Sequence, residues 1–297
     1  MIEKTLKNLT AIVPIGKLSD NLSLIRFWVP IASNHGLKII FVNDAIDFET
    51  SENIKSYVDQ LSSSDIRLIV GKFDGPGGAR NRGLKEVSTE WVCFWDADDM
   101  PIVENIAKEL AASNMENLII GQYEITQTAR DAVKIIPKPT RNLFDISLNP
   151  GLWRFLFRTD IAKKVEFPKI YMGEDQIYLA RLSNYLLSAR ISTNLFYSYT
   201  QGSATQLTSS SSRLKDLQYS IAELSWLGLK TTSIEQSKLI LTLQIRQCLT
   251  LIKRGNSQLR LYGLHTLLFS KLSMNYSVRL IQITRVLKIG VTNARKK

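Results

Sequence analysis

Three carboxylates stand within four positions of the segment CFWDADDM, residues 93–100. Asp96, Asp98 and Asp99 follow a short apolar run, and two like charges about 4 Å apart cost roughly 1 kcal/mol in water and roughly 4 kcal/mol at an effective dielectric near 20. Hard divalent cations prefer carboxylate oxygens, and one or two protein carboxylates plus substrate phosphates suffice to bind them. The segment therefore fits a Mg²⁺ or Mn²⁺ site for a diphosphate, or a solvated acidic turn before Pro101.

Two further segments carry residues for related chemistry. DGPGGARNRGL, residues 74–84, places a glycine cluster before a predicted helix with Arg80, and free N–H groups at a helix start favour anions. It lacks the G-K-[ST] of a Walker loop, so by itself it also fits a plain turn before a surface helix. In GED, residues 173–175, Glu174 and Asp175 either complement the dipole of a helix start or supply a general base.

The elements that must position these residues alternate in type along the first part of the chain. Continuous apolar runs predict strands buried on both faces, and the amphipathic segments between them predict helices. This alternation indicates an α/β domain with a doubly wound sheet, in which ligands bind beyond the carboxyl ends of the strands. Pro14, Asp44 and Asp96 stand at three such ends. The predicted strands are 9–15, 37–44, 66–71 and 91–96, and the predicted helices are 20–34, 51–61 and 78–87.

The alternation stops beyond residue 113, and a different pattern follows. Two short apolar segments predict an antiparallel strand pair, one amphipathic segment fits neither period clearly, and a Ser-rich stretch predicts a hinge before a helical region. These are, in order, 117–127 with 132–137 as the strand pair, 151–164 as the ambiguous segment, 173–187 as a helix, 201–212 as the hinge, and 213–229, 233–254 and 256–289 as helices.

Charge divides the chain at about the same place. Residues 213–297 hold 15 Lys and Arg against 3 Asp and Glu, whereas residues 1–212 hold 23 against 24. The whole excess of the net charge of +11 therefore belongs to the last part of the chain. We predict an α/β domain over residues 1–205 and a basic helical region over residues 206–297.

Cysteine usage and hydropathy predict a cytoplasmic protein. Cys93 and Cys248 stand far apart in apolar surroundings, which indicates buried thiols in a reducing compartment. The N-terminal segment MIEKTLKNLT has no apolar core of a secretory signal, and no run of 18 uncharged apolar residues predicts a spanning helix. His35 and His265 have no recognisable catalytic or metal-binding partner in the sequence.

Taken in order, these segments resemble the family-two glycosyltransferases of the GT-A fold. That family shows a first strand ending in Val-Pro, an acidic turn after the second strand, ARN.G before the third helix, DADD after the fourth strand, and ED further on. The corresponding segments here are AIVPI, FVNDAIDFET, GGARNRGL, FWDADDMP and GEDQIYLARL, over roughly residues 9–200. The resemblance implies a GT-A (Rossmann-like) mixed sheet flanked by helices and followed by a C-terminal α-helical region.

The resemblance also implies donor-binding roles. Pro14 and its backbone would line the nucleotide pocket, Asp44 would bind the base with Arg80 beside it, and Asp96 would face the ribose. The turn after the second strand departs from the family, since Asp44 is followed by Ala and Ile where Gly and Ser are usual, and the next Asp of the pattern falls on Phe48. These departures lie where the base and the ribose of the nucleotide would bind, so they bear on which nucleotide is used.

The remaining matches imply roles in the reaction. Asp98 would bind the divalent metal, Mn²⁺ or Mg²⁺, and Asp99 would support the loop. Asp175 would be the catalytic base, with Glu174 beside it near the acceptor. We expect an inverting, metal-dependent glycosyltransferase of hexosyltransferase type. It would use a nucleotide-diphosphate sugar, with UDP favoured, and a glycan or lipid-linked acceptor, in bacterial surface polysaccharide synthesis.

Other interpretations remain open from the sequence. A sugar-phosphate nucleotidyltransferase would carry a Gly-rich loop with Lys after its first strand, and PIGKLSDN offers only one Gly and one Lys there. A non-enzymatic nucleic-acid-binding protein would use the basic region, although no aromatic residues alternate with its basic residues in a binding motif, so we expect no nucleic acid.

The basic region itself has two interpretations. Its helices either pack on the catalytic domain or contact the anionic inner face of the membrane, which would make the protein peripheral there. Leu280, Ile283 and Leu287 share one helical face, which fits either contact.

Overall fold

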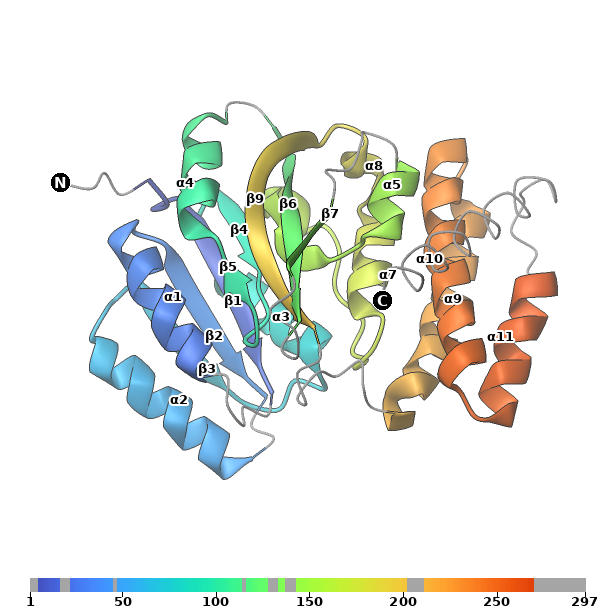
Figure 1. Ribbon diagram of the computed structural model, residues 1–297, viewed down its shortest axis with the longest axis horizontal. Helices are drawn as coiled ribbons and strands as arrows, with labels where there is room; N and C mark the ends of the chain where they lie inside the picture. Colours follow the sequence, from blue (N-terminus) through green and yellow to red (C-terminus); the bar gives the residue numbers. More distant parts are fainter. Residues whose placement is uncertain are drawn as a thin grey trace. The chain divides into compact units, whose positions relative to one another are not determined.

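The computed structural model describes residues 5–16, 22–44, 47–113, 116–127, 133–136, 143–201 and 211–269 (Figure 1). The chain forms two compact units, and each is assembled from segments that are not contiguous in the sequence. The first consists of Met1–Pro139, Gly151–Tyr171 and Ser188–Ser209, and the second of Thr140–Pro150, Met172–Leu187 and Ser210–Lys297. The expected division into domains 1–205 and 206–297 stays a prediction, because a compact unit need not be a domain that folds alone.

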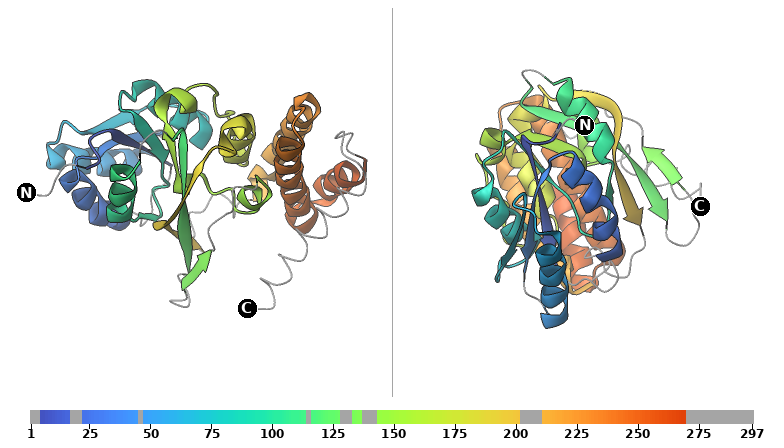
Figure 2. Two further views of the ribbon diagram at one scale, coloured as in Figure 1. Left: turned by 90° about the horizontal axis from the view of Figure 1, so that it is seen from above. Right: turned by 90° about the vertical axis from the view of Figure 1, so that its left-hand side faces the viewer.

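A mixed sheet of nine strands is the centre of the first unit (Figure 2). Its order is β3-β2-β1-β4-β8-β6-β9-β5, with β7 paired to β6. Strands β1 to β4 run parallel, β8 is antiparallel to β4 and β6, and β9 is parallel to β6. The predicted mixed α/β sheet is thus confirmed, including the antiparallel pair β6 and β7. The strands are β1 (Leu9–Ile15), β2 (Lys38–Asn43), β3 (Ile66–Val70), β4 (Trp91–Phe94), β5 (Met100–Pro101), β6 (Leu118–Gln127), β7 (Val133–Ile136), β8 (Phe155–Arg158) and β9 (Arg190–Gln201).

Alternate residues of the central strands face two different layers of helices. Ala11, Val13 and Phe41 belong to the larger apolar core, to which α1, α2 and α4 also contribute. Ile12 and Val42 face the opposite side, where they lie against α3. Both faces are covered, which explains why these strands are apolar throughout. The helices of this unit are α1 (Leu22–Asn34), α2 (Phe48–Leu61), α3 (Pro76–Glu86), α4 (Val103–Ala111) and α6 (Thr159–Ala162), with the 3₁₀ turn η1 (Leu152–Arg154).

Strand β9 and helix α4 were not predicted from the sequence, and one buried carboxylate joins them. Glu109 of α4 accepts hydrogen bonds from the Ser192 hydroxyl at 2.5 Å and the Asn194 amide at 2.8 Å. It also pairs with the Arg190 guanidinium at 2.9 Å. Because its partners satisfy this buried charge, Glu109 can fix the start of β9 to the helix layer.

Helix α10 (Ile234–Arg254) is the centre of the second unit, and α9, α11 and α5 pack against it (Figure 1). The helices predicted at 213–229 and 233–254 are confirmed, whereas the helix predicted at 173–187 is divided into two. No helix in the described part of the chain is long and apolar enough to span a membrane. The other helices here are α5 (Leu143–Leu148), α7 (Glu174–Arg181), α8 (Ser183–Leu186), the 3₁₀ turn η3 (Ser211–Lys215), α9 (Asp216–Lys230) and α11 (Ser257–Phe269).

The helix predicted at 256–289 is confirmed as far as Phe269. The apolar face that we expected at Leu280, Ile283 and Leu287 lies outside the described residues.

Candidate functional site

Asp44 stands at the carboxyl end of β2 and holds the loop that follows β3. Its Oδ1 accepts a hydrogen bond from the Phe73 N–H at 2.5 Å, and its Oδ2 accepts one from the Gly75 N–H at 3.0 Å. The half-buried Pro14, near the end of β1, is paired in register with Val42 of the neighbouring strand β2. A carboxylate can accept about four hydrogen bonds, so these two leave Asp44 capacity for a ligand.

The glycines of the segment 74–84 are required by close contacts. Gly75 precedes α3 with φ +96°, which disfavours a side chain. A Cβ on Gly78 would lie 1.6 Å from the Phe73 carbonyl oxygen, and a Cβ on Gly83 would lie 2.6 Å from Cγ2 of Ile12. The glycines therefore let the loop fold back on α3 and let α3 lie directly on the sheet.

Arg80 and Asn81 of α3 connect this helix to two other parts of the first unit. The Arg80 guanidinium is almost fully buried and donates to Oδ1 of Asp96 at 2.8 Å. It also lies over the Phe167 ring, 5.6 Å from the centroid. Asn81 donates to the Phe167 carbonyl at 2.8 Å and accepts from the Phe167 N–H at 2.9 Å. The segments GGARNRGL and DADD are thus joined by a direct ion pair.

The loop Asp96–Asp99 follows β4 directly, and the pKa values of Asp98 and Asp99 are raised. Burial, together with the charge of Asp96, raises the pKa of Asp98 to about 6. Burial and the charges of Asp96 and Asp98 raise the pKa of Asp99 well above its usual range, although the Thr200 N–H donates to its Oδ1 at 2.8 Å. The loop therefore holds negative charge that neither solvent nor its protein partners fully compensate.

Strand β9 supports this loop from residues that the sequence analysis did not consider. The Tyr197 hydroxyl accepts a hydrogen bond from the Asp96 N–H at 2.9 Å. Burial first, and then the nearby carboxylates of Asp99 and Asp96, raise the pKa of Tyr197 well above its usual range. The alternation of Tyr197, Ser198 and Tyr199 is typical of a strand. The pattern does not reveal which residues the two tyrosine side chains contact.

The residues of the loop fit a divalent cation of the kind expected. Within the described part of the chain, no group of three or more His, Cys, Asp or Glu side chains is placed to hold a metal ion. One or two carboxylates nevertheless suffice when a diphosphate supplies further oxygens. Asp98 meets this requirement, because it is half-buried and the charge of Asp96, which together with burial raises its pKa, would favour a bound cation.

Glu174 and Asp175 belong to the second unit, whereas Pro14, Asp44, Arg80, Asp96 and Asp98 belong to the first. The structure brings these five to or near the carboxyl ends of β1, β2 and β4. Hydrogen bonds through the α3 segment link three of them, Asp44, Arg80 and Asp96.

In the second unit, α7 begins with Glu174 after Gly173, whose φ is +89°. Glu174 is buried, and Oδ1 of the half-buried Asp175 accepts the Gln176 N–H at 2.8 Å. A Cβ on Gly173 would lie 2.9 Å from the Ser220 hydroxyl of α9. The segment GED therefore starts a helix, as predicted, and α9 packs tightly against its first residue.

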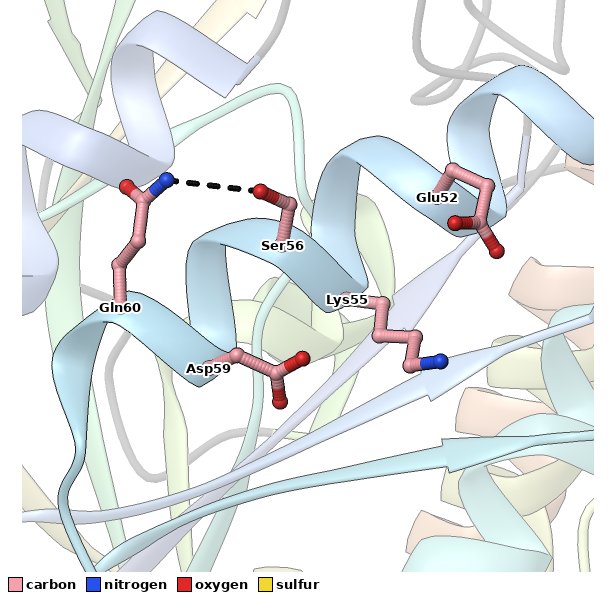
Figure 3. A pocket seen from close by; sticks show the side chains of 5 residues that line it. All are labelled: Glu52, Lys55, Ser56, Asp59 and Gln60. Carbon is pink, nitrogen blue, oxygen red and sulfur yellow. Dashed lines mark hydrogen bonds between the residues drawn. The ribbon is translucent and has the colours of Figure 1, made fainter.

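A separate hollow lies along α2 and has different surroundings (Figure 3). Helix α2 packs on β3, at the edge of the sheet, and β2 and β1 separate β3 from β4. All the lining residues are exposed side chains of this one helix, so the hollow is distinct from the acidic loop. They are Glu52, Lys55, Ser56, Asp59 and Gln60.

Comparison with known proteins shows what part of the sequence is similar to. Residues 24–163 match the model of glycosyl transferase family 2. A curated relative, the Escherichia coli UDP-Glc:alpha-D-GlcNAc-diphosphoundecaprenol beta-1,3-glucosyltransferase WfgD, is 24% identical over 177 residues, which are 58% of this chain and 69% of the relative. The comparisons favour neither the nucleotidyltransferase nor the nucleic-acid-binding alternative.

Solved structures show the same fold at low sequence identity. S. aureus TarS 1-349 in complex with UDP-GlcNAc has a TM-score of 0.61 and 16% identity, covering 94% of this chain and 79% of TarS 1-349. The mannosyltransferase PcManGT from Pyrobaculum calidifontis, in complex with GDP-Man and Mn²⁺, has a TM-score of 0.55 and 13% identity, covering 99% of this chain and 82% of PcManGT. Residues 24–163 are therefore similar to glycosyl transferase family 2, and the chain has the GT-A fold.

Proposed function

We propose that this glycosyltransferase is an inverting, metal-dependent hexosyltransferase that uses a UDP-sugar and a lipid-linked glycan acceptor in bacterial surface polysaccharide synthesis. The name of the Escherichia coli relative supports both substrates, since it describes a UDP-sugar donor and a diphosphoundecaprenol-linked acceptor. The observation that carries the proposal is the ion pair of Arg80 and Asp96, which joins the glycine-rich segment to the acidic loop beside β4.

The donor side of the proposal rests on the first unit. Pro14 and Asp44 line the nucleotide pocket, and the Asp44 carboxylate keeps acceptor capacity for the base. Asp96 faces the ribose, and Arg80 fixes the direction of its carboxylate because the buried guanidinium pairs with it at 2.8 Å.

The metal part of the proposal assigns Asp98 as the protein ligand for Mn²⁺ or Mg²⁺. A bound divalent cation would supply positive charge to stabilise the leaving diphosphate. Asp98 contributes a carboxylate whose burial and neighbour Asp96 favour a cation, and Asp99 supports the loop through its bond to the Thr200 N–H. The Mn²⁺ described for PcManGT supports this part of the proposal.

The acceptor side assigns Asp175 as the catalytic base and Glu174 as its neighbour near the acceptor. The Asp175 carboxylate takes the proton of the acceptor hydroxyl while that oxygen attacks the anomeric carbon in line, and the bond to the diphosphate breaks with its electron pair. The Gln176 N–H donates to one oxygen of Asp175, which helps to fix the direction of the carboxylate.

We also propose that residues 1–205 form the catalytic domain and that the basic region 206–297 brings the protein to the cytoplasmic face of the membrane. The described helices α9 and α10 carry exposed apolar side chains at Trp226, Leu229 and Ile234, and the Lys230 ammonium lies 3.5 Å from the centroid of the Trp226 ring. Trp and Lys together are typical of an interfacial contact with anionic lipid.

A nucleotide-sugar screen tests the proposal. Full-length protein is heated with UDP-sugars, GDP-mannose or nucleoside triphosphates, with Mn²⁺ or with EDTA. A ligand at 100 times its Kd should stabilise the protein by about 2.7 kcal/mol. The stabilising donor is then incubated with a diphospholipid-linked sugar, and the anomeric configuration of the product is read by NMR. We expect inversion at the anomeric carbon and release of UDP. Consumption of a nucleoside triphosphate with a sugar 1-phosphate, and of no nucleotide sugar, would refute the proposal.

A further inference from the structure

Tyr197 is a fully buried tyrosine whose ring and hydroxyl have different partners. Its ring stacks on Trp153, with centroids 4.6 Å apart and planes 11° apart, and it lies in register beside Tyr123 of β6. These contacts fix the ring within the sheet and aromatic layer. The hydroxyl is thereby held at the acidic loop, where it accepts the Asp96 N–H at 2.9 Å.

The acidic loop is fixed to β9 at both of its ends. At the first end is the bond from the Asp96 N–H to the Tyr197 hydroxyl. At the last end, the Thr200 N–H donates to Asp99 at 2.8 Å, and the Tyr197 hydroxyl is also close enough to the Asp99 carboxyl to lower its pKa. Strand β9 therefore bonds to both ends of this four-residue loop.

We infer that Tyr197 is a positioning residue, whose hydroxyl sets the direction of the Asp98 carboxylate toward a divalent cation and its diphosphate. The inference rests on the proposed function, in which Asp98 binds the metal. It adds a residue from a strand about a hundred positions away to the residues that the sequence motifs include.

The physical reason lies in the constraints on the residues around Asp98. The Asp96 carboxylate is fixed by Arg80 at 2.8 Å, and its backbone by Tyr197 at 2.9 Å. Asp99 is fixed through its carboxylate, so the backbone on both sides of Asp98 is held. Without the Tyr197 hydroxyl, the Asp96 N–H loses its acceptor, and the repulsion between the carboxylates can open the loop. Partners that orient metal ligands typically contribute 10–100-fold to metal affinity.

The test compares Tyr197→Phe with Tyr199→Phe in the full-length protein. Tyr199 stands two residues further along the same strand and stacks on the same Trp153, with centroids 5.6 Å apart, so its variant removes a hydroxyl from the same aromatic layer. The Kd of Mn²⁺ in the presence of saturating UDP is measured by calorimetry, and thermal unfolding is measured without metal. We expect Tyr197→Phe to weaken Mn²⁺ binding 10–100-fold and Tyr199→Phe to change it less than threefold.

The outcomes separate this inference from the proposed function. If wild-type protein binds Mn²⁺ with UDP and Tyr197→Phe binds it equally well, the inference is wrong and the metal proposal stands. An equal loss in both variants, or a lowered unfolding temperature in Tyr197→Phe with unchanged Mn²⁺ affinity, also overturns the positioning role, because each indicates a purely structural effect. Absence of Mn²⁺ binding in the wild type overturns the metal part of the proposed function and the inference with it.

Discussion

Replacing Asp98 with Asn should make the metal-free protein more stable while removing its response to metal. The substitution keeps the size of the side chain and removes a charge from the acidic loop. In the folded protein, burial and Asp96 raise the pKa of Asp98 to about 6, whereas an unfolded chain leaves it near 3.9. The folded state therefore binds more protons than the unfolded state between about pH 4 and pH 6, and stability falls as the pH rises through that window.

The size of the effect follows from this shift. Each pKa unit corresponds to 1.36 kcal/mol, so a shift of about two units costs the wild-type protein about 3 kcal/mol well above pH 6. At pH 4 most of that cost is absent, because Asp98 is protonated in the folded protein. Asp98→Asn should therefore stabilise the metal-free protein by about 3 kcal/mol at pH 8 and by well under 1 kcal/mol at pH 4, which is several degrees of Tm at the higher pH.

Urea unfolding of both proteins in EDTA at pH 4, 6 and 8 measures this difference, and a repeat at pH 8 with Mn²⁺ and UDP measures the response to metal. With metal and nucleotide the order should reverse, because only the wild type gains binding free energy. If Asp98→Asn is no more stable than the wild type at pH 8 in EDTA, the electrostatic account of the loop is wrong. Equal stabilisation of both proteins by Mn²⁺ and UDP would remove Asp98 from the metal site.

Three further changes have expected outcomes. Asp175→Asn should keep UDP-sugar affinity and lower the transfer rate by about 10²–10⁴-fold in single-turnover assays, because it removes the proposed base. Arg80→Ala should weaken UDP-sugar binding by roughly 1–3 kcal/mol in calorimetry, because Asp96 loses a buried charged partner. The control Arg82→Ala on the same helix removes a different ion pair, with Glu86, and should leave UDP-sugar affinity unchanged. Deleting residues 270–297, which hold 7 Lys and Arg and no Asp or Glu, should abolish salt-sensitive binding to vesicles of anionic lipid, at about 1 kcal/mol for each basic residue near the surface.

Each of these expectations can fail on its own. An unchanged rate in Asp175→Asn would transfer the role of base to Glu174. Equal donor affinity in Arg80→Ala and Arg82→Ala would make the Arg80 ion pair structural. Vesicle binding that survives the deletion would point to the described helices as the membrane contact.

The parts predicted correctly from the sequence are those with local signals. Strands β1, β2 and β4 are buried on both faces, and their apolar runs show this without knowledge of their partners. Strand β3 was also predicted from its apolar run, but it lies at the edge of the sheet and only Ile66 in it is buried. The glycines of the segment 74–84 are also a local signal in the sequence. The structure explains them, because a side chain at Gly78 would collide with the backbone of Phe73. The crowding of carboxylates in the acidic loop was a local signal as well, and the metal site that it predicts stays a prediction.

The parts that were missed depend on contacts between distant segments. Tyr197 and Asp96 are about a hundred residues apart, and no spacing rule connects a strand tyrosine with a loop N–H. Segment 151–164 was ambiguous because it contains a 3₁₀ turn, a strand and a short helix, each too short for a periodic pattern. The break between α7 and α8 at Leu182 has no Gly or Pro to mark it.

The way in which the GED segment is held has a consequence for engineering acceptor specificity. Residues 172–187 are flanked on both sides by segments of the sheet unit, yet they are grouped with the C-terminal helices. Gly173 has no room for a side chain beside Ser220, and the Gln247 amide donates to Gln176 at 3.2 Å. A chimera that exchanges only the C-terminal helices with a relative would place a foreign surface against the native segment of the proposed base. Transferring acceptor preference between relatives should therefore require that all three segments of the second unit are exchanged together. These segments are residues 140–150, 172–187 and 210–297.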